Sequence, residues 1–154
     1  MGHGKGVGTY FKSSTFSPEV DMKKEKVQIT KISASEVDVF NIYRSQEGDK
    51  NECAIDLRNM IDQSKTSIIC GDLNLCFVNQ RNNEVTRMLE DNGFVQLVNE
   101  ATHLMGGHID HVYSNHDPNK YTVDVMMYSP FYTCKDHDAL CITIKHRQKK
   151  SMRE

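Results

Sequence analysis

Apolar and polar residues alternate along several stretches of the chain, and polar or turn-forming residues separate these stretches. Residues 6–12 (GVGTYFK) are predicted to form a strand, followed by a polar, proline-containing loop through Lys26. Residues 26–33 (KVQITKIS) and 36–44 (EVDVFNIYR) alternate and are rich in β-branched side chains. They are predicted to form two strands joined by a tight turn at residues 34–35.

In two segments the apolar residues recur with the spacing of a helix instead of alternating as in a strand. Between residues 49 and 64, four apolar side chains fall on one helical stripe, and Asp49 or Asn51 can cap its start. Residues 82–91 fit a second helix, with Asn82 as its cap.

The remaining apolar segments are short and predict strands. Residues 66–70 (TSIIC) are apolar enough for a strand buried on both faces. Further strands are expected at residues 94–98, 108–114, 121–128 and 139–145. Because strands outnumber helices and several are neighbours in sequence, we expect an α/β (α+β) layered sandwich rather than a doubly wound sheet. In this sandwich two mainly antiparallel sheets pack face to face, with the helices outside.

The composition fits one globular domain and limits the classes of function. The chain has 154 residues, of which 38% are hydrophobic and 26% charged, and its net charge is −2. It therefore has no global basic field that would recruit nucleic acid, and a polyanion has to be bound locally. No apolar run approaches the roughly 20 residues that a membrane helix needs. The N-terminal MGHGKGVG lacks an apolar signal core, so we expect neither secretion nor a membrane location.

The cysteines indicate a reducing compartment. Their number is odd and none forms a CxxC pair, which favours free thiols over disulfides or a zinc site. We therefore expect an intracellular protein. The five are Cys53, Cys70, Cys76, Cys134 and Cys141.

Polar side chains that can carry chemistry follow the buried strand at residues 66–70. Asp72 and Asn74 stand in the sequence CGDLN. If the chain stays extended, both side chains project to the same side. A carboxylate can orient or deprotonate a water, and an amide can hold that water or a phosphate oxygen. The alternative is an Asx-turn that ends the strand, in which both side chains bond the local backbone.

A second cluster surrounds Asp110, which stands at the start of an expected strand. Three imidazoles lie near it in sequence, at His103, His108 and His111. On a strand His108 and His111 face opposite sides, which is poor geometry for a shared metal. We expect most of these histidines to lie on the surface.

Two further clusters of polar residues lie next to expected strands, one before a strand and one at the end of a strand. Lys135, Asp136 and His137 precede the last apolar segment, where an Asp beside a His can supply a metal ligand and a proton donor. Tyr43 and Arg44 close the segment VFNIYR, and both side chains suit phosphate oxygens. Either cluster can also be a polar turn or a strand end whose Arg reaches solvent.

In sequence order, GDLN after a strand, then GGHID, then KDH before a final apolar strand, resemble the endonuclease/exonuclease/phosphatase superfamily. This superfamily includes DNase I-like and apurinic-type nucleases. The chain is most similar to the endonuclease domains of non-LTR retroelements and related mobile elements. The similarity extends from Gly6, where GVGTYFK resembles the family's GG-V-A strand, to about Ile144.

The resemblance implies a role for each motif residue. Asp72 would orient or deprotonate the attacking water, and Asn74 would bind beside the scissile phosphate. His137 would hydrogen-bond a non-bridging oxygen in the pentacoordinate transition state, and Asp110 would fix and charge its imidazole. Asp136 would contribute to a Mg²⁺ site.

Several positions depart from the family pattern. Tyr43 matches a phosphate-contacting tyrosine, but the family's Y-x-P is Tyr43-Arg44-Ser45 here. Lys135 replaces a common Ser, and its charge would either help to bind the phosphate or displace the metal. The family's first strands, which carry an Asn and the main metal-binding Glu, would lie upstream of Met1. We therefore expect residues 1–146 to form a DNase I-like domain whose first third is missing, with 147–154 as a charged tail.

The sequence leaves functions of different classes open. The leading hypothesis is a Mg²⁺-dependent phosphodiesterase, with Mn²⁺ as the alternative ion. It would hydrolyse DNA in the nucleus, as mobile-element endonucleases do, with activity reduced or lost without the Glu. A second hypothesis is a catalytically dead fragment that serves as a binding module. A phosphatase acting on phospholipid head groups ranks below DNA, because no apolar membrane-docking loop stands out. No obligate protein partner is expected.

Overall fold

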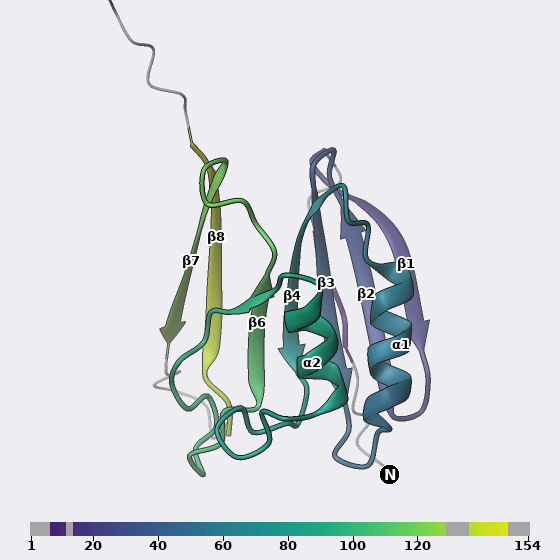
Figure 1. Ribbon diagram of the computed structural model, residues 1–154, viewed down its shortest axis with the longest axis vertical. Helices are drawn as coiled ribbons and strands as arrows, with labels where there is room; N and C mark the ends of the chain where they lie inside the picture. The colour runs from purple at the N-terminus through teal and green to yellow at the C-terminus, as the bar shows by residue number, and fades with distance from the viewer. Residues whose placement is uncertain (1–6, 12–13, 129–135, 148–154) are drawn as a thin grey trace, which may run out of the picture.

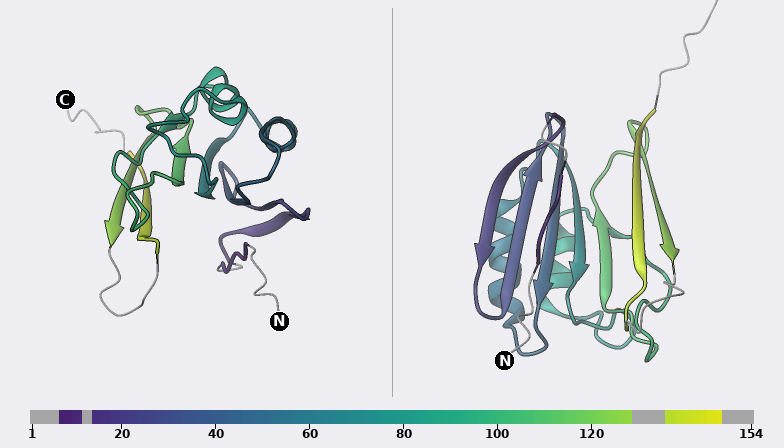
Figure 2. Two further views of the ribbon diagram at one scale, coloured as in Figure 1. Left: turned by 90° about the horizontal axis from the view of Figure 1, so that it is seen from below. Right: turned by 180° about the vertical axis from the view of Figure 1, so that it is seen from behind.

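The computed structural model describes residues 7–11, 14–128 and 136–147 of the chain. A six-stranded mixed sheet has the strand order β1-β2-β3-β4-β6-β5, and a second sheet consists of β7 and β8. Both helices cover one face of the larger sheet, and β7 and β8 lie toward its other face (Figure 1; Figure 2). The elements are β1 (Ser17–Lys23), β2 (Val27–Ser33), β3 (Val37–Arg44), α1 (Lys50–Met60), β4 (Thr66–Asp72), α2 (Glu84–Asp91), β5 (Val95–Gln96), β6 (Asp110–Ser114), β7 (Tyr121–Tyr128) and β8 (Ala139–His146).

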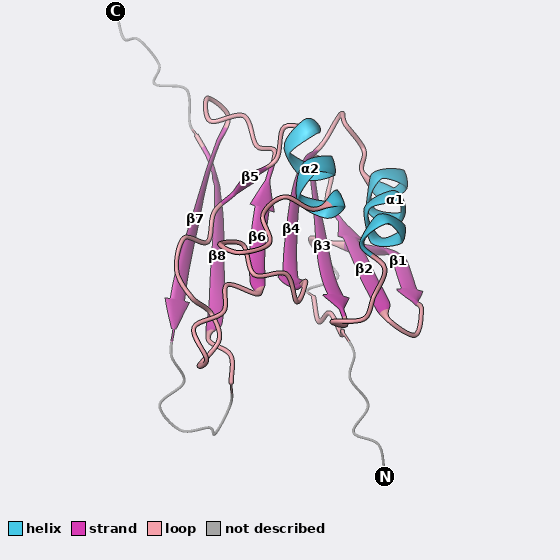
Figure 3. Cartoon of the chain, turned by 60° about the horizontal axis from the view of Figure 1, so that its bottom comes forward, coloured by secondary structure: helices cyan, strands magenta, loops and turns pink. Residues whose placement is uncertain are grey.

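The crossover through α1 explains why the larger sheet is mixed. Strands β2 and β3 are antiparallel neighbours joined by a tight turn, in which Ala34 N donates to Val37 O (2.8 Å). Helix α1 then carries the chain over the sheet, so that β4 runs parallel to β3. Strand β6 returns antiparallel to β4. The ends of β3 and β4 and the start of β6 therefore lie side by side at one end of the strands (Figure 3).

The helices begin at polar caps. Asp49 caps α1, and its side chain accepts a hydrogen bond from Glu52 N (2.6 Å). Helix α2 is capped by Asn83, which accepts from Thr86 N (3.0 Å), whereas the sequence indicated Asn82. One orphan amide of the first turn is satisfied in each helix. Helix α1 ends at Met60, earlier than the predicted residue 64, because the backbone becomes extended at Ile61.

Alternation along the strands builds two cores on opposite faces of the larger sheet. The core under the helices includes Val27, Ile29, Phe40, Ile42, Leu57, Ile69 and Leu89. The second core lies between the larger sheet and the strands β7 and β8, and it includes Ile68, Val98, Val112, Val123, Val125, Leu140 and Ile142. The expected layered sandwich with outer helices is confirmed. Within the described residues, its second sheet has only two strands.

The N-terminal strand prediction is wrong for the part that the structure describes. Residues 7–11 join no ladder, because they lie over side chains of β2 and β3 instead of along a free strand edge. Their hydrogen bonds go instead to side chains of the sheet: Val7 N donates to Gln28 Oε1 (2.9 Å), and Asn41 Nδ2 donates to Gly8 O (3.2 Å). The region predicted as a loop contains β1, which pairs with β2 across a register shift between Pro18 and Val20.

Candidate active site

Three candidate residues stand side by side because of the strand register. Tyr43 of β3 is the partner of Asp72 in β4, and Asp72 is the partner of Asp110 in β6. Cross-strand partners project to the same face of a sheet. Tyr43, Asp72 and Asp110 lie on the face of the larger sheet that is directed toward β7 and β8. They stand where β3 and β4 end and β6 begins. The ladder therefore assembles two carboxylates and a phenol that are far apart in sequence.

Gly71 is required for the position of Asp72. Its φ is +133°, a conformation that side chains rarely adopt. A Cβ at this position would overlap the carbonyl oxygen of Ile42, its partner in β3, and would lie 2.8 Å from Ile42 N. Because Gly71 has no side chain, β4 can lie close to β3 immediately before Asp72.

The chain does not stay extended from Asp72 to Asn74. Asn74 has φ +48°, and its amide donates to Asp72 Oδ1 (2.8 Å), so an Asx-turn ends the strand. The side chain of Asn74 also donates to Arg44 O (2.8 Å). Both residues nevertheless line one cavity. The turn and the functional assignment are therefore compatible.

Arg44 lies inside the protein, with 1% of its surface exposed. Its guanidinium donates to four carbonyl groups, those of Leu73 (2.8 Å), Asn74 (3.1 Å), Gly48 and Gln46 (3.5 Å). These hydrogen bonds direct the guanidinium to the backbone. Arg44 also lines the same cavity as Asn74, and its contact with phosphate stays a prediction. Arg44 holds the loop after β4 in place.

His111 fixes the next carbonyl of the same loop, although the sequence suggested a surface residue. The ring is 2% exposed and donates from Nε2 to Leu75 O (2.7 Å), while Gln96 Nε2 donates to its Nδ1 (2.6 Å). Burial, which disfavours the charged ring, lowers the pKa of His111 to about 4 despite its hydrogen bond to Leu75. Arg44 and His111 together bind three consecutive carbonyls, at residues 73–75.

His137 meets Asp110 directly. Its Nδ1 lies 2.7 Å from Asp110 Oδ2, and the two side chains are 40% and 14% exposed. The backbone around His137 is held by residues 102–104: Leu104 N donates to Asp136 O (2.7 Å) and Asp138 N to Thr102 O (2.8 Å).

Thr102 links this segment to β6. It is fully buried, and its hydroxyl accepts a hydrogen bond from Asp110 N (3.1 Å), while its carbonyl accepts from Asp138 N. One residue therefore anchors the backbones on both sides of the His137–Asp110 contact.

The pKa values of two groups are shifted in ways that suit catalysis. Burial, reinforced by the nearby charge of Asp110, raises the pKa of Asp72, although the amide of Asn74 opposes the shift. Partial burial disfavours the charged form of His137, but the hydrogen bond and charge of Asp110 outweigh it. Asp72 and Asp136 add to this effect, and the pKa of the imidazole is raised.

The candidates surround a cavity of about 950 Å³. Tyr43, Asp72, Asn74, Asp136 and His137 line it. Asp110 lies behind His137 through the contact described above. Lys135 lies outside the described residues.

The sequence reasoning missed Lys50 and His103, which also line the cavity. Lys50 is the first residue of α1, and no local motif marks it. The position of His103 shortly before GGHID could have indicated it, but we expected this histidine to lie on the surface.

The chemistry of the donors fits a hard divalent cation. One atom each of Asp72, Asp110 and His137 can be chosen such that all lie within 4.8 Å of one another. Asp136 adds an exposed carboxylate to the same cavity. Mg²⁺ is commonly held by one or two carboxylates together with water and substrate phosphates. Among the described residues, Asp72 and Asp136 are the two carboxylates that line the cavity.

Solved structures of other proteins share this fold over most of the chain. The human Nocturnin catalytic domain with bound sulfate has a TM-score of 0.56 at 12% identity and covers 89% of this chain and 62% of its own. The endonuclease domain of TRAS1, a telomere-specific non-LTR retrotransposon, has a TM-score of 0.59 at 10% identity, covering 84% and 67%. An endonuclease/exonuclease/phosphatase family protein from Leptotrichia buccalis has 0.51 at 13%, covering 85% and 60%.

The chain thus spans between 60% and 67% of the length of these three chains. No protein-family model and no curated protein sequence matches it. The three structures cover between 84% and 89% of this chain. The chain therefore has the DNase I-like fold of the endonuclease/exonuclease/phosphatase superfamily.

Proposed function

We propose that the chain is a divalent-metal-dependent phosphodiesterase whose substrate is DNA. The observation that carries the proposal is that Asp72, Asp110 and His137 lie together, and that Asp72 and His137 line the cavity. A carboxylate with a raised pKa and an imidazole charged by a second carboxylate provide a base and a hydrogen-bond donor for phosphoryl chemistry.

Each residue has a distinct part in the proposed reaction. Asp72 orients a water molecule and takes its proton as the oxygen attacks phosphorus. His137, held at Nδ1 by Asp110, donates from Nε2 to a non-bridging oxygen as charge accumulates there. The bond from phosphorus to the leaving oxygen breaks, and the leaving alkoxide takes up a proton. The products are a phosphomonoester and an alcohol.

A bound Mg²⁺, or Mn²⁺ in its place, would neutralise phosphate charge and polarise the phosphorus–oxygen bonds. Asp136 would hold the ion, with Asp72 as the second carboxylate of the cavity. Tyr43 and Asn74, at the ends of the neighbouring strands, would contact the phosphate. Lys50 would add a positive charge at the cavity wall.

DNA is the proposed substrate class because of the retroelement-like motif order, and the TRAS1 domain of the same fold is an endonuclease. We also propose an intracellular location, in the nucleus for a DNA substrate. Four described cysteines, Cys53, Cys70, Cys76 and Cys141, are free thiols, as is usual in reducing compartments. Among the described helices, none is both long and apolar enough to span a bilayer.

The test is nicking of supercoiled plasmid DNA, intact or containing abasic sites, with Mg²⁺ or Mn²⁺ supplied. We expect nicking by the wild type to disappear in His137→Ala and to persist in His146→Ala, a control at the far end of β8. Nicking that survives in His137→Ala refutes the proposed site. A panel that includes phospholipid head groups separates DNA from the other substrate class.

The second candidate is a binding module without turnover. The feature that favours it is that, of the two described carboxylates lining the cavity, Asp72 is already assigned as the base, which leaves Asp136 alone for the metal. It predicts that DNA binds, that no phosphodiester is cleaved, and that Mg²⁺ leaves the melting temperature unchanged. A melting temperature that rises with Mg²⁺ in the wild type and not in Asp136→Asn supports the enzyme instead.

A further inference from the structure

We propose that His103 is a second phosphate-binding residue of the cavity, which donates a hydrogen bond from Nε2 to a phosphate oxygen. The inference rests on the proposed function, because it names a further contact to the same substrate group. His103 lines the cavity together with His137, yet neither the motif order nor the carboxylate–imidazole pair includes it.

Backbone pairing places the two imidazoles next to each other. His103 and His137 form an isolated antiparallel bridge. The hydrogen bonds lie on either side of this pair, from Leu104 N to Asp136 O and from Asp138 N to Thr102 O. Residues paired in this way carry their side chains closer together than hydrogen-bonded partners do. The ring centroids are accordingly 4.9 Å apart, at an interplanar angle of 84°.

A local hydrogen bond fixes the tautomer of His103. Its Nδ1 accepts from Met105 N (3.1 Å), within the turn that Gly106 closes by donating to His103 O (2.8 Å). A ring nitrogen that accepts a hydrogen bond carries no proton, so the neutral ring bears its proton on Nε2. Within the described part of the chain, this Nε2 has no hydrogen-bond partner. It is therefore a donor available to a ligand.

The charges of the site define the ligand class for this donor. The cavity wall carries Asp72, whose carboxylate is close enough to His103 for the two to interact electrostatically. Lys50 and His137 line the same cavity and offset part of this negative charge, so that a phosphate group can bind beside His103. A phosphodiester has two non-bridging oxygens, and the neighbouring rings of His137 and His103 supply one donor for each.

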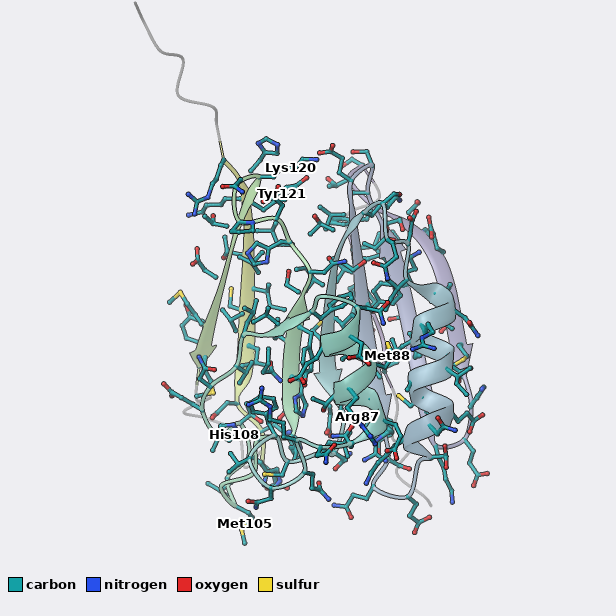
Figure 4. The ribbon with its side chains drawn as sticks, viewed as in Figure 1. Arg87, Met88, Met105, His108, Lys120 and Tyr121 are labelled. Carbon is teal, nitrogen blue, oxygen red and sulfur yellow. The ribbon has the colours of Figure 1, made fainter. Side chains whose placement is uncertain are left out.

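Met105 is 86% exposed next to this pair, and in Figure 4 it extends away from the ribbon at the edge where the loops gather. Met105 and His103 both line the cavity.

Two substitutions separate ligand binding from a structural role of the ring. In His103→Asn the amide oxygen can replace Nδ1 as acceptor for Met105 N, but no group reaches the place of Nε2. In His103→Gln the amide nitrogen can replace Nε2 as donor, but the acceptor for Met105 N is lost. Phosphate binding through Nε2 predicts that Gln retains affinity and Asn does not. A role only in holding the loop predicts the reverse.

The experiment follows the ¹⁵N-labelled imidazoles of the full chain by NMR during titration with inorganic phosphate. We expect a saturable shift at Nε2 of His103 and an affinity about tenfold to a hundredfold lower in His103→Asn, as for the loss of one hydrogen bond to a charged group. His103→Gln should lose much less. Melting temperatures of both variants show that they fold.

The proposal is overturned if phosphate does not shift the His103 resonances, or if His103→Asn binds phosphate as the wild type does. Plasmid nicking is measured in parallel. Phosphate binding at His103 without nicking refutes the proposed enzyme and leaves the binding site standing. Nicking with unchanged KM and kcat in His103→Asn refutes the role of His103 and leaves the enzyme standing.

Discussion

The carboxylate of Asp110 lies 2.7 Å from Nδ1 of His137, although 27 positions separate the two residues in the sequence. Asp110 is placed by its ladder with β4, and His137 by its backbone pairing with residue 103. Two independent pieces of backbone structure thus converge on one hydrogen bond, and its electrostatic consequence can be measured.

Replacing Asp110 with Asn should lower the pKa of His137. The Asp110 carboxylate is the largest influence that raises this pKa, through its hydrogen bond and its charge. A pH titration of the ring resonances by NMR measures the effect. Asp136→Asn is the matched control and should lower the pKa less, since Asp136 acts on the ring by charge alone. Equal shifts in the two variants would contradict the assignment.

The same pair affects stability in a defined direction. The folded-state pKa of His137 is raised above the unfolded value of 6.5. Its contribution to stability is therefore complete below pH 6.5 and is lost as the pH rises through the folded-state pKa. Asp110→Asn should flatten that part of the stability profile, as determined by urea unfolding at a series of pH values.

Replacing His111 with Gln should remove an acid-sensitive part of the stability. The pKa of His111 is lowered to about 4 in the folded protein, so the unfolded chain binds a proton more readily between pH 6.5 and 4. Stability falls as the pH decreases through this range, by about 3 kcal/mol for a shift of this size. Urea unfolding at pH 7 and pH 4.5 tests it. His146→Gln, at an exposed position, should retain the pH dependence of the wild type.

Replacing Gly71 with Ala should destabilise the protein by about 3 kcal/mol or more, because a Cβ would collide with the backbone of β3. Gly93→Ala is the matched control: its φ is also positive, at +79°, but the space around it is open. The control should cost only about 1 to 2 kcal/mol for the backbone conformation. Similar melting temperatures for the two variants would show that the close approach of β4 to β3 is unimportant.

Replacing Arg44 with Met tests whether this residue holds the loop after β4 or contacts phosphate. The substitution leaves the carbonyls of residues 73–75 without two of their donors, at a cost of about 1–3 kcal/mol for each buried group. Arg58→Met, at an exposed position of α1, should be nearly neutral. A stable Arg44→Met variant with weakened phosphate binding would support the phosphate contact.

Local sequence patterns were sufficient for most of the elements. The alternation in β2 and β3, the cap at Asp49 and the bounds of β7 each follow from neighbouring residues. The failures at residues 7–11 and in β1 have a different cause. A strand needs the backbone edge of a neighbour: residues 17–23 pair with β2, whereas residues 7–11 contact side chains of β2 and β3.

The site was predictable where a motif and strand register agree, and less so elsewhere. Asp72 and Asp110 become neighbours once β4 pairs with β6. Arg44 continues the alternation of Phe40 and Ile42 on β3, which predicts that it points inward. Because Arg is charged, we expected it at the surface instead. His103 has no such pattern, because its place depends on an isolated bridge between two loops.

The most direct measurement for the proposed site is a double-mutant cycle on the Mg²⁺-dependent nicking rate, with Asp110→Asn and His137→Ala made singly and together. Because Asp110 acts through His137, the double variant should be no slower than His137→Ala alone. Each variant should lose about a hundredfold to ten-thousandfold in rate. Rate losses that multiply in the double variant, or nicking unaffected by either change, would contradict a shared catalytic unit.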